Sequence, residues 1–333
     1  PELFDFDRHM RAISNAGDPL EKLTAAIDWE IFRPLFKGLR KHEDSKMGRP
    51  PYDDILMLKI LVLQQLYNLS DDQTEFMIRD RFSFLRFLKL DHHSNIPDAK
   101  TIWLFREKIK TANLERLLFD KFSSLLAKQG MLAKPGSILD ASFVEVPKQR
   151  NSKEENEKIK QGETPKDWKK KPHKLAQKDV DARWTKKNNQ TFYGYKNHTM
   201  VNGNKKLITD YAVTDASVHD SQAAPALLTK LARGSSVHAD SAYHTDGISA
   251  VIRKRKLDAH ICAKGYRNRP LTRSQIRTNR RISRFRARGE HIFARMQKFG
   301  GDFIRTIGMR RAEVQIGLQN LAYNLDRYRF LAS

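Results

Sequence analysis

The pattern of apolar residues changes at Pro135-Gly136, and this change limits the possible folds more than any other feature of the chain. Before it, apolar residues recur at helical spacing, and residues 55–63 are almost all apolar, as in a helix buried on most sides. After it, residues 136–146 have the composition of a strand. We therefore expect an all-α N-terminal domain over residues 1–130 and a sheet-containing domain over residues 136–333.

Helix start signals recur through the N-terminal region. Asp18, Asp53 and Asp98 each precede an apolar-periodic run, and Ser70 with Gln73 three residues later has the form of a capping box. Short helices joined by tight turns are typical of a helix-turn-helix unit, although many all-helical domains share this pattern. The sequence therefore predicts helices here and leaves contact with DNA open.

A hairpin is the best-specified element of the second domain. Two strand-like runs, residues 190–201 and 206–214, flank Asn202-Gly203, a dipeptide suited to a tight turn with positive φ at both positions. From residue 136 onward the expected order is strand, hairpin, helix, strand, helix, strand and long helix. This order predicts an α/β fold in which helices pack on the faces of a mixed sheet.

Positive charge dominates the composition. Lys and Arg total 62 against 39 Asp and Glu, a net charge of +23. Such a surface attracts a polyanion, because each neutralised phosphate releases condensed counterions. Nucleic acid is the first candidate partner. An anionic membrane is the alternative, but the sequence has no apolar run of about 18 residues and no signal-peptide pattern. A ribosome-like structural role would not need the dispersed carboxylates considered below.

The single cysteine, Cys262, allows neither an intrachain disulfide nor a thiolate metal cluster. This favours a reducing, cytoplasmic location, such as a bacterial or archaeal nucleoid. Residues 147 to about 187 are polar and strongly basic, with Lys169, Lys170 and Lys171 in succession. A stretch with so little aliphatic content cannot offset its ordering entropy. We interpret it as a mobile basic insertion that orders on DNA phosphates, with a solvated loop as the alternative.

Three carboxylates stand out from the acidic residues in polar loops. Asp140 and Asp240 each end an apolar strand-like run, and Glu290 begins a helical segment. A buried carboxylate is costly unless it is paired or bound to metal. Three carboxylates can hold two divalent ions roughly 3.5 to 4 Å apart for an in-line displacement at phosphorus. The alternatives are that each Asp only caps a turn or helix, and that Arg286 and Glu290 form a surface ion pair.

Several blocks in this order resemble the DDE transposases of bacterial insertion sequences, in particular the insertion-sequence-five family. The blocks are residues 47–52, 69–73, 139–142, 193–198, 218–221 and 239–243, followed by Arg286 and Glu290. That family usually has a Tyr three residues before the Arg and a Lys seven residues after the Glu. This chain has Ser283 and Gln297 there, with Lys298 beside the latter. This departure affects the expected DNA contacts near these positions more than it affects the expected role of Glu290.

The resemblance implies a ribonuclease-H-like mixed sheet with flanking helices and an active site with two Mg²⁺ ions, for which Mn²⁺ can substitute. It implies that Asp140 bridges both metals while Asp240 and Glu290 each complete one site. The expected partners are double-stranded DNA, as terminal inverted repeats and target, and further copies of the chain in a homodimer or higher synaptic oligomer. The phosphate-contact candidates are Lys196, His198, Arg286, Arg49, Lys169, Lys170, Lys171 and Lys298.

Two other functions remain open at this point. A metal-dependent nuclease of the same fold would cut DNA without joining it. A catalytically silent, sequence-specific DNA-binding regulator would bind without chemistry. Trp168, Trp184 and Tyr243 are candidates to stack on a displaced base, and local packing is the favoured alternative for Trp184.

Overall fold

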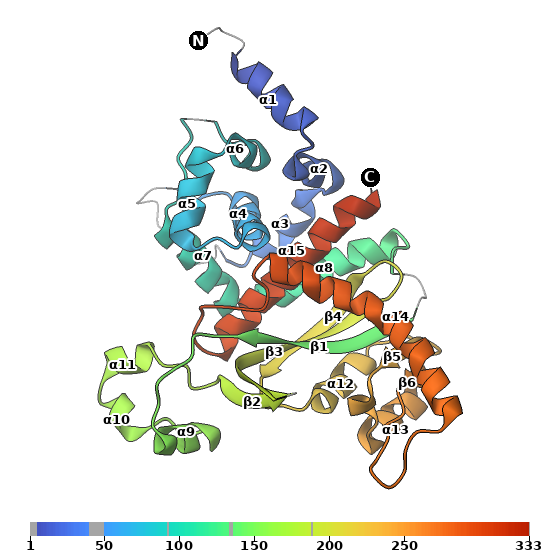
Figure 1. Ribbon diagram of the computed structural model, residues 1–333. Coiled ribbons are helices and arrows are strands. Elements are labelled where there is room, and N and C mark those ends of the chain that lie inside the picture. Colours follow the sequence, from blue (N-terminus) through green and yellow to red (C-terminus); the bar gives the residue numbers. More distant parts are fainter. Residues whose placement is uncertain (1–4, 40–49, 92, 133–135, 188, 333) are drawn as a thin grey trace. The chain divides into compact units, whose positions relative to one another are not determined.

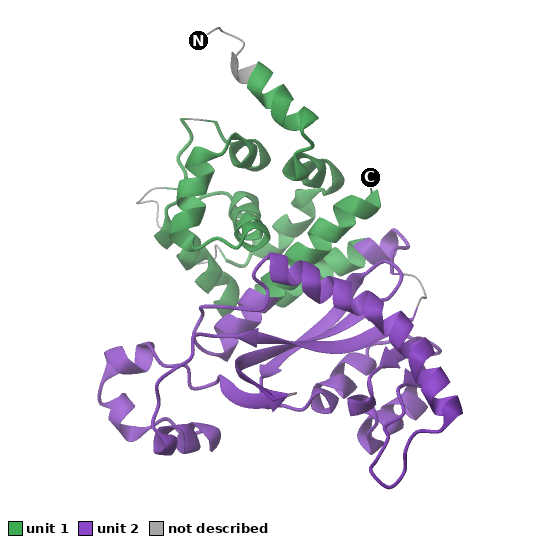
Figure 2. Cartoon of the chain, viewed as in Figure 1, with its two compact units in different colours: residues 1–125, 317–333 green, residues 126–316 purple. Residues whose placement is uncertain are grey.

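The computed structural model describes residues 5–39, 50–91, 93–132, 136–187 and 189–332 (Figure 1). The chain divides into two compact units (Figure 2). Unit 1 comprises Pro1–Leu125 with Gly317–Ser333, and unit 2 comprises Leu126–Ile316. The C-terminal helix therefore begins in unit 2 and ends in unit 1. The sequence analysis placed all of residues 136–333, and therefore this whole helix, in the second domain.

Unit 1 is helical, as predicted. Its elements are α1 (Asp5–Asn15), α2 (Pro19–Ala26), η1 (Trp29–Phe32), α3 (Arg33–Phe36), α4 (Asp54–Tyr67), α5 (Asp71–Asp80), α6 (Phe82–Leu88), α7 (Ala99–Thr111) and most of α8 (Leu114–Lys128). Asp18, Asp53 and Asp98 cap α2, α4 and α7 by accepting backbone N–H groups. Ser70 and Gln73 form the predicted capping box of α5. Helix α4 is buried on most sides, as its composition requires.

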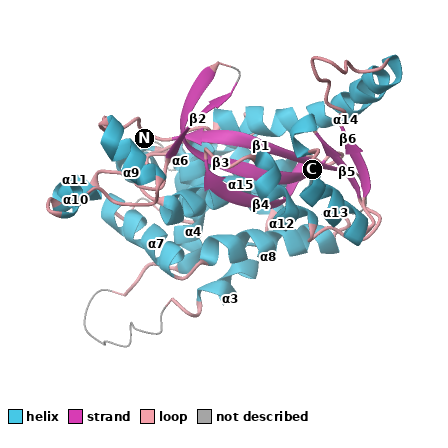
Figure 3. Ribbon diagram, turned by 90° about the horizontal axis from the view of Figure 1, so that it is seen from below, coloured by secondary structure: helices cyan, strands magenta, loops and turns pink. Residues whose placement is uncertain are grey.

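Unit 2 is built on a mixed six-stranded sheet (Figure 3). The strands are β1 (Ser137–Glu145), β2 (Arg183–Lys187), β3 (Gln190–Asn202), β4 (Leu207–Asp215), β5 (Ser236–Ala239) and β6 (Asp258–Ile261). Their order is β2-β3-β1-β5-β6, and β4 also pairs with β3. Strand β1 is antiparallel to β3 and parallel to β5. This mixed sheet with flanking helices is the predicted ribonuclease-H-like arrangement.

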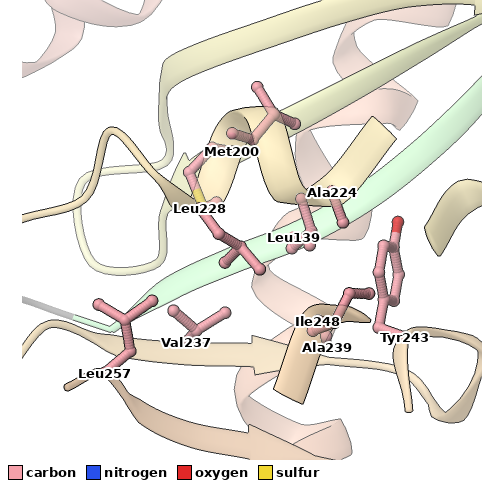
Figure 4. Close-up of a cluster of buried hydrophobic side chains, with 10 residues drawn as sticks. Leu139, Met200, Ala224, Leu228, Val237, Ala239, Tyr243, Ile248 and Leu257 are labelled. Carbon is pink, nitrogen blue, oxygen red and sulfur yellow. The ribbon is translucent and has the colours of Figure 1, made fainter. Parts of the chain in front are cut away.

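Helices cover both faces of this sheet. Further helical elements of unit 2 are α12 (Asp220–Leu228), η2 (Ser241–Tyr243), α13 (Asp246–Arg255), α14 (Arg273–Lys298) and the first part of α15 (Met309–Ala332). On one face, Leu139, Met200 and Val237 pack with α12 and α13 in an apolar core (Figure 4). On the other face, α14 crosses β1, β5 and β6. At this end of the sheet, the alternation of strand side chains separates the apolar core under α12 and α13 from the layer under α14. Further along β1 and β3, Val144 and Tyr195 pack with Ile304 in a second apolar core.

The predicted hairpin is confirmed, but its turn differs from the expected two-residue form. Strands β3 and β4 are joined by residues 203–206, and the positive φ of 56° belongs to Lys206. The Asn202 side chain accepts backbone N–H groups of Asn204 and Lys205. Gly203 serves a different purpose, because a Cβ there would lie 2.5 Å from the Phe285 ring. The glycine therefore provides room for an aromatic side chain.

The basic insertion is folded, so its interpretation as an arm without packed structure is wrong. It forms three short helices, α9 (Lys153–Lys160), α10 (Lys166–Lys169) and α11 (Pro172–Ala176). They enclose Trp168, which is 0% exposed and donates its indole N–H to Glu155 at 2.6 Å. The ammonium groups of Lys174 and Lys178 lie 5.5 and 5.2 Å from the Trp168 ring centroid. Lysine stems supply apolar surface that a count of aliphatic residues misses, and Trp168 is not available to stack on a base.

Candidate active site

Strand pairing brings Asp140 and Asp240 together. Ser137 pairs with Val237 and Ile138 with His238 in parallel register, and each Asp follows two residues after the second pair. Side chains alternate with period two along a strand, and neighbouring strands lie about 4.8 Å apart. The two aspartates therefore lie side by side on the face crossed by α14. The sequence analysis expected each Asp at the end of an apolar strand-like run. Asp240 directly follows β5, whereas Asp140 lies inside β1, which continues to Glu145, and the sheet register explains why the two meet.

Arg286 of α14 lies between the two aspartates. Its Nη2 atom is 3.6 Å from Asp140 Oδ2 and 4.0 Å from Asp240 Oδ2. Gly289, one turn later, allows this close approach, since a Cβ there would lie 3.3 Å from the Ile138 side chain. The sequence analysis expected Arg286 to contact a DNA phosphate. In this structure its guanidinium faces the carboxylates instead.

The environment of Asp140 disfavours its charge. Burial raises the pKa of its carboxyl group, and the nearby charge of Asp240 adds to this, while Arg286, the Ala141 N–H and Lys187 act in the opposite direction. An ionised carboxylate in such a place is stabilised by a cation. Two adjacent carboxylates offer the oxygen ligands that Mg²⁺ prefers. The aspartate pair therefore fits a hard divalent ion near the position that the Arg286 guanidinium occupies.

Glu290 is not brought to this pair. Its side chain is exposed, although it follows Arg286 by one helical turn and so lies on the same side of α14. Within the described part of the chain, no group of three or more His, Cys, Asp or Glu residues is placed to hold a metal ion. The structure thus assembles the two aspartates and leaves the third expected carboxylate outside.

Lys196 and His198 lie inside unit 2 rather than at its surface. Lys196 is 7% exposed and donates to the Val218 carbonyl at 2.7 Å and to Asp220 at 2.9 Å. His198 is 1% exposed, its Nε2 lies 2.9 Å from Thr214 Oγ1, and burial lowers its pKa to about 4. This placement differs from the expected phosphate contacts.

The reason for this difference is strand alternation. Asp140 is paired with Thr199 on β3, so Lys196 and His198, at odd distances from Thr199, point to the opposite face. On that face they support the apolar layer that contains Met200. Counting residues along the strand would have excluded both from the carboxylate site.

The other cations expected at DNA have different positions. Lys169, Lys170 and Lys171 are exposed at the α10–α11 junction, and Lys298 is exposed at the end of α14. Arg49 lies outside the described residues. Helix α14 begins at Arg273, with Thr272 and Gln275 as its capping box, so it starts 16 residues earlier than the helix predicted from Gly289. Its first three turns are basic and largely exposed, which makes this segment a further candidate DNA contact.

The sequence analysis missed a group of side chains at the far end of β1. Phe143 and Phe192 stack with ring centroids 4.1 Å apart and an angle of 8° between the rings. Lys187 lies 5.7 Å from the Phe143 centroid and 4.0 Å from Asp220. The alternation of apolar residues along β1 and β3 was the available signal for this pair. Tyr243, by contrast, is buried, so its expected role in base stacking is not possible in this structure.

Comparison with protein families decides the class of protein. A family model described as Transposase DDE domain matches residues 132–325, more than half of the 333 residues. The chain belongs to the Transposase DDE domain family. A second model, Transposase domain (DUF772), matches residues 8–108. No solved structure matches the chain.

Membership of the Transposase DDE domain family makes this chain a DNA transposase. The family match spans Asp140, Asp240 and Glu290, and the family implies dependence on a divalent metal. It also implies DNA as the partner. None of the described helices combines the length and the apolar content needed to cross a bilayer.

Proposed function

We propose that this transposase cleaves DNA at the terminal inverted repeats of an insertion sequence and joins the resulting 3′-hydroxyl ends to target DNA. The observation that supports this most is the pair Asp140 and Asp240, set side by side by the β1–β5 register beneath a basic helix. The chain's family supplies the reaction class. Assignment to the insertion-sequence-five family and location in a cytoplasmic nucleoid are parts of the same proposal.

The proposed reaction has two steps, a hydrolysis and then a transesterification at phosphorus. Water first attacks the phosphorus at the element end, the P–O3′ bond breaks, and a 3′-hydroxyl and a 5′-phosphate result. The 3′-oxygen then attacks a target phosphorus, forms the new P–O bond and releases a target 3′-hydroxyl. Two Mg²⁺ or Mn²⁺ ions held by Asp140, Asp240 and Glu290 would activate the attacking oxygen and stabilise the leaving one.

Arg286 links DNA binding to the state of the carboxylates. Its guanidinium now faces Asp140 and Asp240 at 3.6 and 4.0 Å. A phosphate group binds a guanidinium through two parallel hydrogen bonds and competes well with a longer ion pair. We therefore propose that the scissile phosphate draws Arg286 away from the aspartates. This movement of Arg286 would leave room for Glu290, one helical turn later on α14, to approach them.

The exposed cations complete the proposed DNA surface. Lys169, Lys170 and Lys171 on the insertion and Lys298 at the end of α14 would bind backbone phosphates without reading sequence. Arg49, which lies outside the described residues, is a further proposed phosphate contact from the sequence alone. A homodimer or a higher oligomer would hold the two element ends together.

Mg²⁺-dependent cleavage of a duplex carrying the DNA that flanks the gene tests the proposal. We expect the purified protein to cut it and Asp240→Asn to bind the duplex without cutting. Retained cleavage by Asp240→Asn would contradict the site assignment. A pre-cleaved end offered with target plasmid distinguishes joining from a nuclease that only cuts. A silent regulator would instead keep its full function in Asp140→Ala.

A further inference from the structure

The hairpin formed by β2 and β3 extends past the β1–β3 pairing and bends back towards β1. That pairing ends at Gly194, and residues 190–192 of β3 pair only with β2. Phe143 is paired with Lys196, so in a flat sheet Phe192, four residues from Lys196, would lie about 13 Å further along. The rings of Phe143 and Phe192 nevertheless stack, with centroids 4.1 Å apart and 8° between their planes. The hairpin is therefore bent towards Phe143.

Gly194 allows this bend. Its φ of 147° lies in a region that L side chains rarely adopt, and a Cβ there would lie 2.3 Å from the Val144 carbonyl oxygen. The stacked rings then hold the bent hairpin against β1. The position of the hairpin tip is thus determined by a glycine in the backbone and by one aromatic contact.

The bend places Lys187, the last residue of β2, beside the start of α12. Its Nζ atom lies 5.7 Å from the Phe143 ring centroid and 4.0 Å from Asp220 Oδ2. Asp220 already has a closer partner, because Lys196 Nζ lies 2.9 Å from its Oδ1 atom. A separation of 4.0 Å is too long for a hydrogen bond, and 50% of the Lys187 side chain is exposed. The Lys187 ammonium can therefore bind a further anion.

The charge of Lys187 also reaches the aspartate pair. Burial raises the pKa of the Asp140 carboxyl group, while the charges of Arg286 and Lys187 oppose this rise. Burial likewise raises the pKa of the Tyr243 hydroxyl, and Asp220 and both aspartates of the pair add to this. The partner of Lys187 on α12 and the aspartate pair thus lie within electrostatic range of one hydroxyl group.

The short length of β5 explains how Lys187 can act on Asp140. Lys187 contacts Phe143, which lies an odd number of residues from Asp140 and so points to the opposite face of the sheet. Strand β5 pairs with Ser137 and Ile138 of β1, and the next bridge on that side is at Glu145. Within the described residues, Asp140 therefore lies on a stretch of β1 that pairs with a strand on one side only. Past this edge, a cation on one face can influence a carboxylate on the other.

We infer that Lys187 binds a non-bridging oxygen of the DNA phosphate held at Asp140 and Asp240, so that the β2–β3 hairpin positions the cleaved strand. The inference rests on the proposed function, because the aspartate pair defines which phosphate is meant. A lysine suits this role, since its ammonium is a point charge with three rotatable donors on a flexible stem. If Lys187 instead only supported Asp220, its charge would have no effect at one chosen phosphate.

Salt dependence tests for the phosphate contact. The affinity for a duplex that carries the element end is measured at several salt concentrations with the Asp240→Asn protein, which should bind without cutting. Removing one phosphate contact lowers the slope of log affinity against log salt by about one, and we expect this in Lys187→Gln. Lys186→Gln is the matched control, because this exposed neighbour leaves β2 on the opposite face, and its slope should not change. An unchanged slope in Lys187→Gln would overturn the inference.

A modified duplex identifies the phosphate. A methylphosphonate at the cleavage position removes the negative charge of that phosphate alone, and it should weaken binding by the Asp240→Asn protein. With Lys187→Gln added, the weakening should be smaller by about fivefold, because the charged partner is already absent. With Lys186→Gln added, it should keep its full size. The same weakening with and without Lys187→Gln would show that Lys187 does not contact this phosphate.

The conservative variant and the cleavage assay separate the remaining possibilities. Lys187→Arg keeps the charge and should keep both the salt slope and the effect of the methylphosphonate; a loss equal to that in Lys187→Gln would reduce Lys187 to a support for the hairpin and reject the inference. Since binding needs no cleavage, a coupling between Lys187 and this phosphate in a protein that cuts nothing would leave the inference standing and the proposed function rejected. Cleavage without the coupling would give the reverse result.

Discussion

The two faces of the sheet in unit 2 differ sharply, although neighbouring residues of the same strands form them. On one face Leu139, Val237 and Met200 are buried in an apolar core with α12 and α13. On the other, Asp140 and Asp240 lie beneath α14 with Arg286 between them. Leu139 and Asp140 are adjacent in sequence, yet Leu139 packs in an apolar core and Asp140 lies beside a guanidinium group.

This difference shows how the protein supports an unfavourable charge. The apolar face supplies burial free energy, while the polar face holds a carboxylate whose pKa is raised by that same burial. A site that binds a cation needs carboxylates that are poorly compensated in its absence. The contrast holds around Asp140 and Asp240; further along β1, Val144 on the same face packs with Tyr195 and Ile304 in a second apolar core.

The largest expected effect comes from the polar face. Asp140→Asn should slow cleavage by about 10³-fold or more, since a bound metal supplies several kcal/mol of transition-state stabilisation. The melting temperature at neutral pH should not fall, because a raised pKa means that the ionised form weakens the folded state there. Single-turnover cleavage and thermal unfolding measure the two effects. Asp167→Asn, at an exposed site, is the control and should change neither the cleavage rate nor the melting temperature. Undiminished cleavage by Asp140→Asn would show that this face of the sheet does not hold the catalytic carboxylate.

The apolar face should respond in the opposite way. Leu139→Ala removes a side chain that is 1% exposed and should lower the free energy of unfolding by about 2–5 kcal/mol. Urea denaturation followed by circular dichroism measures the change. Ile276→Ala, at a position 40% exposed on α14, is the control and should have little effect on stability. A similar loss in both variants would show that the core in Figure 4 is not what stabilises unit 2.

Acid sensitivity should also follow the apolar face. The pKa of His198 is lowered from 6.5 to about 4 by burial, so the unfolded chain binds its proton more readily than the folded one. The neutral, buried His198 therefore contributes on the order of 3 kcal/mol to the free energy of unfolding above pH 6.5. This contribution is lost as the pH falls towards 4. Urea denaturation at several pH values should show a flatter profile for His198→Gln. His173→Gln should follow the parent protein; identical profiles in all three proteins would argue against a neutral buried His198.

The smallest effect concerns the contact between the charged groups. Arg286→Gln should raise the affinity of the DNA-free protein for Mn²⁺ by about tenfold, because a cation that competes for the carboxylates is removed. Calorimetric titration measures it without any need for cleavage. Arg277→Gln, on an exposed turn of the same helix, should leave the affinity unchanged. A lower affinity in Arg286→Gln would mean that the arginine orients the aspartates rather than competing for them.

Local signals in the sequence predicted much of this molecule. The caps at Asp18, Asp53 and Asp98 and the box at Ser70 depend on residues a few positions apart, so they can be read directly. The hairpin and the two strand-associated aspartates were also predictable. These features all follow from the alternation or spacing of residues within a single element.

Features that depend on distant residues were not predictable in this way. The folding of the insertion depends on lysine stems packed around Trp168. A composition count treats these lysines only as charged residues and misses their apolar surface. The close approach of α14 to β1 depends on Gly289, which faces Ile138 from another part of the chain. The stacking of His238 on His260 and Phe285 joins two strands and a helix. Only the predicted placement of Lys196 and His198 could have been corrected from the sequence, because counting residues along β3 puts them on the sheet face opposite Asp140.

The pairing of β1 with β5 has a consequence for how such a chain can vary. The sheet register fixes the distance between Asp140 and Asp240. The length of the segment between β1 and β5 therefore has no effect on that distance. The small domain formed by α9, α10 and α11 is therefore a replaceable module. Descendants of this chain could enlarge, shrink or exchange it, and so acquire new DNA preferences, while the distance between the two aspartates stayed the same.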